Sequence, residues 1–178
     1  MKILLIILLI LVFVVAIVLI LAMFQPKSVR FSRKIFIGAA KAEVYGHVGS
    51  LQAYHTWNPW AQDDPTQEVT FGGEDGAVGS TMAWEGKRTG MGIMTISEAK
   101  GPDTVTYDLE FIKPFKGQAR ARLTLSDMQG GTEVEWHYEG ENAFIARVFA
   151  VFMNFEKMIG GQYDKGLAEL KELAEKSS

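Results

Sequence analysis

Hydrophobic and polar residues are distributed in three different ways along this chain of 178 residues. Residues 3–24 contain no polar side chain at all. Between residues 29 and 139, short stretches place hydrophobic and polar side chains at alternate positions, which predicts strands with one dry and one wet face. From residue 156 onward, hydrophobic residues recur every three or four positions, which predicts an amphipathic helix. The pattern therefore predicts an α+β domain preceded by one long apolar segment.

The strand pattern is clearest in the second half of the predicted sheet, where three stretches share a dry face. This face consists of Val105, Tyr107, Leu109, Phe111, Ala119, Ala121, Leu123, Leu125, Val134, Trp136 and Tyr138. Glycine-rich turn signals, such as residues 72–76 and 127–131, separate the stretches. An earlier strand is expected over residues 29–37, with Phe31 and Ile35 on its dry side. We therefore expect an antiparallel sheet with one buried face.

The wet face of the last two predicted strands is rich in charge. If these strands pair with each other, Arg120 and Arg122 face Glu133, Glu135 and His137. We interpret this arrangement as a charge ladder on a solvated sheet face, where such pairs contribute little to stability.

Residues 143–175 are expected to form one long helix with two unlike halves. The face of the second half consists of Ile159, Tyr163, Leu167, Leu170 and Leu173. The first half, residues 144–155, is interrupted by only two polar side chains. Its excess of apolar surface indicates plain core, the wall of an apolar ligand cavity or a patch against a membrane. The adjacent Gly160 and Gly161 weaken a helix and suggest a kink or a close approach to the aromatic corner formed by residues 57–60.

Two short helices are expected between residues 41 and 60, and they end in that corner. The sequence Trp57-Asn58-Pro59-Trp60 places two large rings on either side of a proline. Proline disfavours helix at the preceding residue and fixes the turn. The two rings either plug one end of the core or line the mouth of a pocket.

The apolar segment at residues 3–24 is long enough to cross a bilayer. At about 1.5 Å per residue it spans roughly 33 Å, against a hydrocarbon core of about 30 Å. A cleaved signal peptide is the alternative, but it usually has a shorter apolar region. We therefore interpret residues 1–28 as a single-pass transmembrane anchor with a short linker, and residues 29–178 as one domain. Lys and Arg are more frequent after the segment than before it, which places the domain in the cytoplasm.

Composition and charge narrow the classes of function. The chain has no cysteine, which excludes disulfides and thiolate chemistry. All 21 acidic residues and all but two of the 18 basic residues follow residue 28. This acidic balance makes nucleic acid an unexpected partner. The three histidines have no metal-ligand spacing, so we expect neither a metal nor a cofactor.

The candidates for acid–base catalysis gather near the aromatic corner. They are His55, Asp63 and Asp64. Asp63-Asp64-Pro65 is a turn-type sequence that predicts a solvated loop, and a lone histidine beside aromatic residues is more often packed than catalytic. We therefore assign no catalytic residue, and enzymatic activity stays an alternative.

The order strand, short helices, six strands and long helix resembles the START-like helix-grip superfamily, also called SRPBCC or polyketide cyclase/dehydrase and lipid transport. The motifs that carry the resemblance are the aromatic corner at residues 57–60, GMGIMTI at 90–96, FIKPF at 111–115, GTEVEW at 131–136 and the helix residues 166–171. The resemblance covers about residues 29–175 and is strongest to membrane-anchored bacterial members. The resemblance implies a curved antiparallel sheet wrapped around the C-terminal helix, with a cavity between them for lipids, sterols, polyketides or other hydrophobic molecules. It supplies no universal catalytic motif.

Large apolar side chains on the inner faces of the sheet and helix are the expected contacts of such a ligand. They are Trp57, Trp60, Trp84, Tyr107, Phe111, Trp136, Phe152, Phe155 and Ile159. We interpret the protein as a membrane-anchored domain that binds or transports a hydrophobic small molecule. The alternatives are a cyclase, dehydratase or hydrolase acting on an apolar substrate, and a scaffold that presents its outer sheet face to a protein partner that the sequence does not identify.

Overall fold

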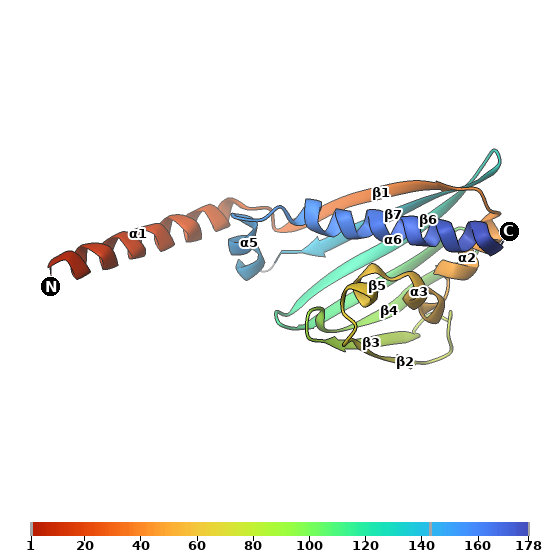
Figure 1. Cartoon of the computed structure of the whole chain (residues 1–178), viewed down its shortest axis with the longest axis horizontal. Coiled ribbons are helices and arrows are strands. Elements are labelled where there is room, and N and C mark those ends of the chain that lie inside the picture. Colours follow the sequence, from red (N-terminus) through yellow and green to blue (C-terminus); the bar gives the residue numbers. More distant parts are fainter. Residues whose placement is uncertain (1, 143, 178) are drawn as a thin grey trace.

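In the computed structural model, seven strands form one antiparallel sheet that curves around a long C-terminal helix (Figure 1). The structure describes residues 2–142 and 144–177, without the side chains of Phe155 and Ser177. The elements are α1 (Lys2–Phe24), β1 (Ser28–Ile37), α2 (Lys41–Val48), α3 (Leu51–Trp57), α4 (Pro59–Asp63), β2 (Glu68–Gly72), β3 (Thr81–Gly86), β4 (Gly90–Lys100), β5 (Thr104–Lys113), β6 (Gly117–Met128), β7 (Gly131–Glu141), α5 (Phe144–Ala150) and α6 (Phe155–Ser177). The strand order is β1-β7-β6-β5-β4-β3-β2. This is the predicted α+β helix-grip fold.

The buried face of the sheet is the predicted dry face. Leu123 on β6 pairs with Trp136 on β7, and both side chains are buried. The helix α6 closes this face with Tyr163, Leu167 and Leu170, which recur at the predicted spacing and are also buried. Each fully buried side chain of this size stabilises the fold by roughly 1.5–3 kcal/mol. The core therefore lies between α6, the short helices and the sheet.

The N-terminal helix α1 projects away from the domain (Figure 1). It has 23 residues and is long and apolar enough to cross a membrane. A signal sequence near an N-terminus shares these properties.

Three short helices, rather than the expected two, follow β1. The extra helix arises because Asn58 and Pro59 separate α3 from α4. The Asn58 side chain accepts a hydrogen bond from the Trp60 N–H at 3.1 Å and so caps α4, while Pro59 occupies its first turn. The predicted turn at this corner is thus the start of a new helix.

The expectation of one continuous C-terminal helix from residue 143 is wrong, because residues 151–154 interrupt it. Residue 143 itself lies outside the described residues. The Phe152 and Met153 N–H groups bond back to the Phe149 carbonyl and end α5. The Asn154 side chain then accepts from the Lys157 N–H at 2.9 Å, the contact expected of an N-cap for α6. The break separates the most apolar half of the segment from the half that covers the sheet.

The two adjacent glycines of α6 do not interrupt the helix, and neither approaches the aromatic corner. The helix runs through both, and Gly160 faces the guanidinium group of Arg33 on β1. The close approach to the corner is made by Gly166 instead. A Cβ added there would lie 3.0 Å from the Trp136 ring and 3.1 Å from Pro59.

The expected charge ladder is confirmed in part, since Arg122 lies opposite His137 in the register of β6 and β7, but the ion pairs have other partners. Arg120 pairs with Asp108 on β5 at 2.7 Å, and Arg122 lies 3.7 Å from Glu98 on β4. Glu133 instead pairs with a lysine of β1. The ladder therefore runs across the outer face of several strands, because a long side chain reaches a neighbour on either side of its own strand.

Candidate functional site

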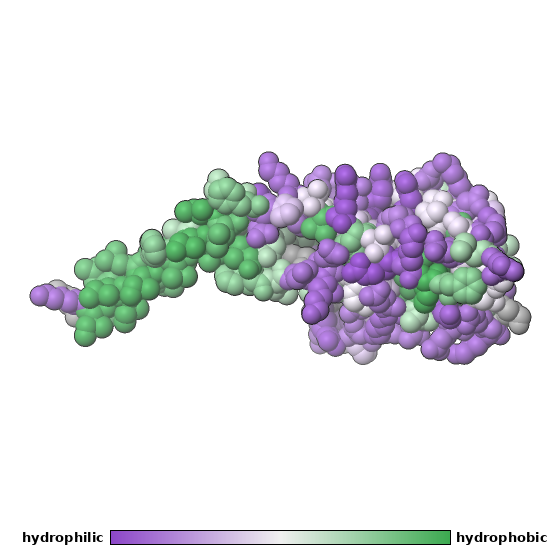
Figure 2. Space-filling view, turned by 90° about the horizontal axis from the view of Figure 1, so that it is seen from above, coloured by the Kyte–Doolittle hydropathy of each residue, from purple (hydrophilic) through white to green (hydrophobic). Residues whose placement is uncertain are grey.

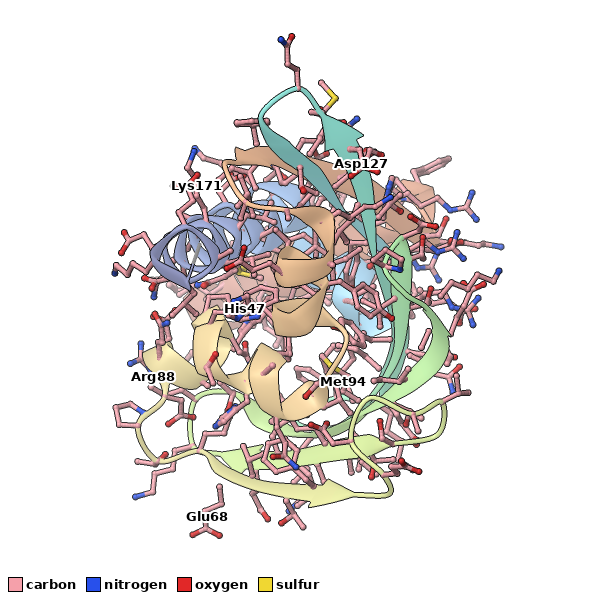
Figure 3. All side chains as sticks on the ribbon, turned by 90° about the vertical axis from the view of Figure 1, so that its right-hand side faces the viewer. His47, Glu68, Arg88, Met94, Asp127 and Lys171 are labelled. Carbon is pink, nitrogen blue, oxygen red and sulfur yellow. The ribbon has the colours of Figure 1, made fainter. Side chains whose placement is uncertain are left out.

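A cavity of about 580 Å³ lies between the inner face of the sheet, the helices α3 and α4, and the first turns of α6. It is more enclosed and more apolar than the surface hollows beside β1, on the outer face of the sheet and at the start of α5. The sheet contributes Met82, Trp84, Met94, Leu109, Phe111, Ala121, Trp136 and Tyr138. The helices contribute Tyr54, Trp60, Met158, Ile159 and Tyr163. Figure 3 shows Met94 between the short helices and the sheet.

An aromatic cluster centred on Trp136 forms the wall between the cavity and the core. The Trp136 and Tyr163 rings stack with centroids 3.9 Å apart. The Trp60 ring meets Trp136 edge-on at 6.3 Å and the Trp57 ring does so at 5.2 Å. The Trp136 indole N–H is buried and meets no acceptor among the described residues. Rings held on several sides in this way make a stiff wall for an apolar ligand.

Polar side chains gather at the end of the cavity formed by α4 and the turn between β3 and β4. The two carboxylate oxygens of Asp63 accept hydrogen bonds from Lys165 Nζ at 2.7 Å and Gln162 Nε2 at 2.9 Å. These hydrogen bonds, of which the one from Lys165 has the larger effect, hold the pKa of Asp63 below its ordinary value. Gln67 Nε2 donates to Thr89 Oγ1 at 2.9 Å. Arg88 lines the same end and donates to the Asp63 carbonyl at 2.6 Å. This end of the cavity thus carries a carboxylate, a guanidinium group and two oriented amides.

The two amides leave their carbonyl oxygens unused. Gln67 Oε1 and Gln162 Oε1 are buried and have no hydrogen-bond partner among the described residues. The Asp63 carboxylate can only accept, so Gln162 must turn its nitrogen toward it. A buried acceptor without a donor costs about 1–3 kcal/mol. A ligand that donates hydrogen bonds here would recover that free energy.

Asp64 organises the loop beside this polar end. It was expected in a solvated loop, but this is wrong, since the residue is 1% exposed. Its carboxylate accepts from Thr66 Oγ1 at 2.6 Å and from the N–H groups of Arg88 and Thr89 at 2.7 and 3.0 Å. The Thr66 hydroxyl and these backbone groups hold the pKa of Asp64 far below its ordinary value. Asp64 therefore ties α4 to the turn between β3 and β4.

The three candidate acid–base residues do not form one site. Asp63 lines the cavity, whereas Asp64 is engaged by the loop. The His55 ring packs against Phe71, with centroids 5.9 Å apart, and is not part of the cavity wall. Among residues 2–142 and 144–177, no group of three or more His, Asp or Glu side chains is arranged to hold a metal ion.

The structure brings together five of the nine predicted ligand contacts. The five that line the cavity are Trp60, Trp84, Phe111, Trp136 and Ile159. Trp57 and Tyr107 are instead fully buried, and their polar atoms donate to the carbonyls of His47 and Val48. Phe152 is 71% exposed and lies in the break before α6. The side chain of Phe155 lies outside the described residues.

Several lining residues were absent from the sequence prediction. Met82 lies two positions before the recognised Trp84 on β3, and Met94 lies opposite Met82 on β4. Flexible methionines suit the wall of an adaptable cavity. Gln162 follows Ile159 by three positions and so shares its helix face. Gln67 carries no sequence signal, because it comes from the loop after α4 and is placed by tertiary contacts alone.

Comparison with known proteins identifies the family and the fold. The model of the family described as polyketide cyclase / dehydrase and lipid transport matches residues 28–175. No curated protein matches the chain significantly.

Several solved structures share this architecture at low sequence identity. A protein from Chromobacterium violaceum is 18% identical, with a TM-score of 0.60 over 85% of this chain and 99% of that one. The Aha1 dimer from Colwellia psychrerythraea is 16% identical, with a TM-score of 0.58 over 83% of this chain and 96% of that one. The di-domain ARO/CYC StfQ from the steffimycin biosynthetic pathway is 9% identical, with a TM-score of 0.61 over 84% of this chain and 51% of that one.

Proposed function

The chain belongs to the polyketide cyclase / dehydrase and lipid transport family, and we propose that it binds a hydrophobic small molecule in the cavity while α1 anchors it to a membrane. The observation that carries the proposal is the cavity of about 580 Å³ with aromatic and methionine walls. Small-molecule sites are typically concave, largely apolar and roughly 300–1,000 Å³ in volume. The cavity has the size and lining of such a site.

The polar end of the cavity restricts the chemistry of the ligand. Gln67 and Gln162 offer two unpaired carbonyl oxygens, while the charge of Asp63 is balanced by its ion pair with Lys165. Arg88 also lines this end of the cavity. A carboxylate ligand could not donate a hydrogen bond to either amide oxygen. A neutral, mostly apolar molecule with a hydroxyl or N–H group at one end fits these groups better. Sterol-like and polyketide-like molecules with a free hydroxyl meet that description.

Enzymatic turnover of such a molecule is the second candidate, and Asp63 is the observation that favours it, because its carboxylate lines the cavity. Both oxygens are engaged by Lys165 and Gln162, and the lowered pKa makes the carboxylate a weak proton acceptor. The contacts of Asp63 therefore favour binding over acid–base catalysis.

Photo-crosslinking of the full chain in lipid nanodiscs tests the binding proposal. The probe is a diazirine-bearing sterol with a free hydroxyl, and mass spectrometry locates the crosslinked peptides. We expect crosslinks at cavity residues such as Met94 and Met158. Crosslinks confined to α1 would show that the probe meets only the bilayer-exposed helix, and would overturn the proposal.

Two matched variants test whether the probe binds inside the cavity. Ala121 is buried and lines the cavity, whereas Ala83 lies between the inward Met82 and Trp84 and faces the opposite side of the sheet. Ala121→Trp should therefore abolish the cavity crosslinks, and Ala83→Trp should leave them unchanged. Equal crosslinking in both variants would contradict binding in this cavity.

The methyl ether of the same probe tests the proposed polar contact. The ether has the same apolar body but cannot donate a hydrogen bond. Loss of a hydrogen bond worth about 1–1.5 kcal/mol predicts roughly tenfold weaker competition against the hydroxyl probe. Equal competition by the ether would show that Gln67 and Gln162 do not contribute to specificity, but would not contradict binding in the cavity.

A further inference from the structure

An apolar surface at the membrane-proximal end of the domain is separate from the cavity. It consists of Phe144, Ile145 and Phe149 on α5, Phe152 and Met153 after it, and Phe115 in the turn between β5 and β6, and is called the proximal face below; all six side chains are exposed. The Phe115 and Phe149 rings lie 5.9 Å apart, which joins the turn to the helix. Figure 2 shows the apolar surface of α1 continuing onto this end of the domain. So large a contiguous apolar surface marks an interaction site.

The proximal face is held in a fixed position beside the end of α1. α5 contacts α1, whose Ala22 is completely buried. Asn142, just before α5, donates from its side chain to the Pro26 carbonyl at 3.1 Å and from its backbone to the Lys27 carbonyl at 2.8 Å. The short linker after α1 is thereby bonded to the chain that enters α5.

The length of α1 sets the depth of this face when the helix crosses a bilayer. Its 23 residues span about 35 Å, compared with a hydrocarbon core of about 30 Å. Ala22 lies two residues from the end of the helix, or about 3 Å along its axis. α5 therefore lies at the level where acyl chains meet the headgroups.

Basic side chains border the same surface. Lys27, Lys116 and Arg147 line one hollow together with Phe144, and none of the three forms a salt bridge with a carboxylate in the described part of the chain. The Arg147 guanidinium lies over the Phe144 ring, 5.2 Å from its centroid. Glu110 and Glu141 line the hollow as well, so the cations are in excess by one charge there. Aromatic residues bordered by lysine and arginine are the composition of surfaces that lie in a bilayer interface.

We propose that the proximal face is a second membrane contact, which lies in the bilayer interface with its aromatic side chains at the acyl boundary and Lys27, Lys116 and Arg147 at the phosphates of anionic phospholipids. This contact fixes the orientation of the domain on the membrane, because it adds a second point of attachment beside α1. The inference rests on α1 crossing the bilayer and is independent of what the cavity holds.

Depth measurements on the full chain in nanodiscs test the proposal. The chain has no cysteine, so single variants Phe149→Cys and Phe115→Cys take one spin label each. Met128→Cys is the matched control, since Met128 is also an exposed apolar residue but ends β6 beside the β6–β7 turn, at the end of the domain far from α1. Val12→Cys, in the middle of α1, reports whether the helix crosses the bilayer.

The proposal predicts that labels at 115 and 149, like that at 12, are relaxed by dissolved oxygen more than by a water-soluble nickel chelate. The label at 128 should show the opposite preference. Equal exposure to the chelate at 149 and 128 would overturn the proposal. A chelate-accessible label at 12 would overturn it together with the anchoring by α1.

The role of the three cations is tested with lipid charge. In nanodiscs that contain phosphatidylglycerol, replacement of Lys27, Lys116 and Arg147 by Gln should move the label at 149 toward water. In discs of phosphatidylcholine alone the replacement should have no effect. A control that replaces Lys100, Lys171 and Lys176, all remote from α1, should leave the label unmoved. Indifference to lipid charge in the parent protein would overturn the assignment of anionic phospholipid.

Discussion

Three glycines of α6 should respond in different ways to the same substitution. Gly161 is exposed, and a Cβ added to it meets no atom within 4 Å. Because alanine favours a helix over glycine by about 1 kcal/mol, Gly161→Ala should raise the free energy of unfolding by that amount. For a chain of this size the gain corresponds to about 2–4 °C in Tm.

Gly166→Ala has the same helix-propensity gain but a steric cost that exceeds it. The new Cβ would lie 3.0 Å from the Trp136 ring and 3.1 Å from Pro59. Trp136 cannot retreat freely, because it stacks on Tyr163. Overpacking of this kind costs about 1–3 kcal/mol, so the net change should lie between zero and a loss of about 2 kcal/mol. The displaced ring should also narrow the cavity and lower probe crosslinking.

Gly160→Ala separates these two effects. The atoms that its Cβ would meet belong to the Arg33 guanidinium, the flexible end of a side chain that can move away. The propensity gain should therefore be partly retained. Tm of the full chain in detergent micelles, followed by tryptophan fluorescence, should decrease in the order Gly161→Ala, Gly160→Ala, Gly166→Ala. A Gly166→Ala variant as stable as Gly161→Ala would refute the packing argument.

Three further outcomes follow from the same contacts. Because the pKa of Asp64 is lowered in the folded protein, its carboxylate stabilises the fold above the ordinary carboxyl pKa of about 4, and this contribution is lost as pH falls toward the lowered value. Asp64→Asn should therefore lower Tm at pH 7 but much less at acid pH. Asp127→Asn, at an exposed carboxylate, should change Tm little at either pH. Trp57→Ala should lower the free energy of unfolding by about 3–5 kcal/mol, whereas Phe152→Ala should barely change Tm. Comparable decreases in Tm would contradict the burial of Trp57 and the exposure of Phe152. A flexible insertion of about 20 residues after Pro26 should slow transfer of a labelled lipid from vesicles to the cavity, and an unchanged rate would exclude direct loading from the bilayer.

The fold was predictable because its main signals are local and repeated. Alternation around Trp136 and the helical spacing of Tyr163 and Leu167 fix which faces meet. The break in the C-terminal helix was missed because residues 144–155 are almost uniformly apolar, and the only signal for it is Asn154 as a cap. Apolar content over that stretch cannot tell a buried helix from one exposed at a membrane-proximal surface.

The cavity was less predictable than the fold, because position along a strand decides what lies above each side chain. Tyr107 and Phe111 occupy the same face of β5, yet Tyr107 is sealed beneath the short helices and Phe111 reaches the cavity. That difference depends on where α3 and α6 cross the sheet. The orientation of the Gln67 amide, with its carbonyl oxygen unpaired, depends on contacts with a turn more than 20 residues away, which no spacing in the sequence indicates.

The connection between α1 and β1 also determines how the domain bears mechanical load. β1 is an edge strand that begins a few residues after α1 and pairs with β7 along ten residues, Ser28 to Ile37. Figure 1 shows α1 continuing roughly along the direction of β1, so a pull between α1 and the domain acts along the strand. Such a force shears all the hydrogen bonds of the β1–β7 ladder together, whereas a pull across the strand would open them one at a time. α1 is thus joined to the sheet in the geometry that resists tension best.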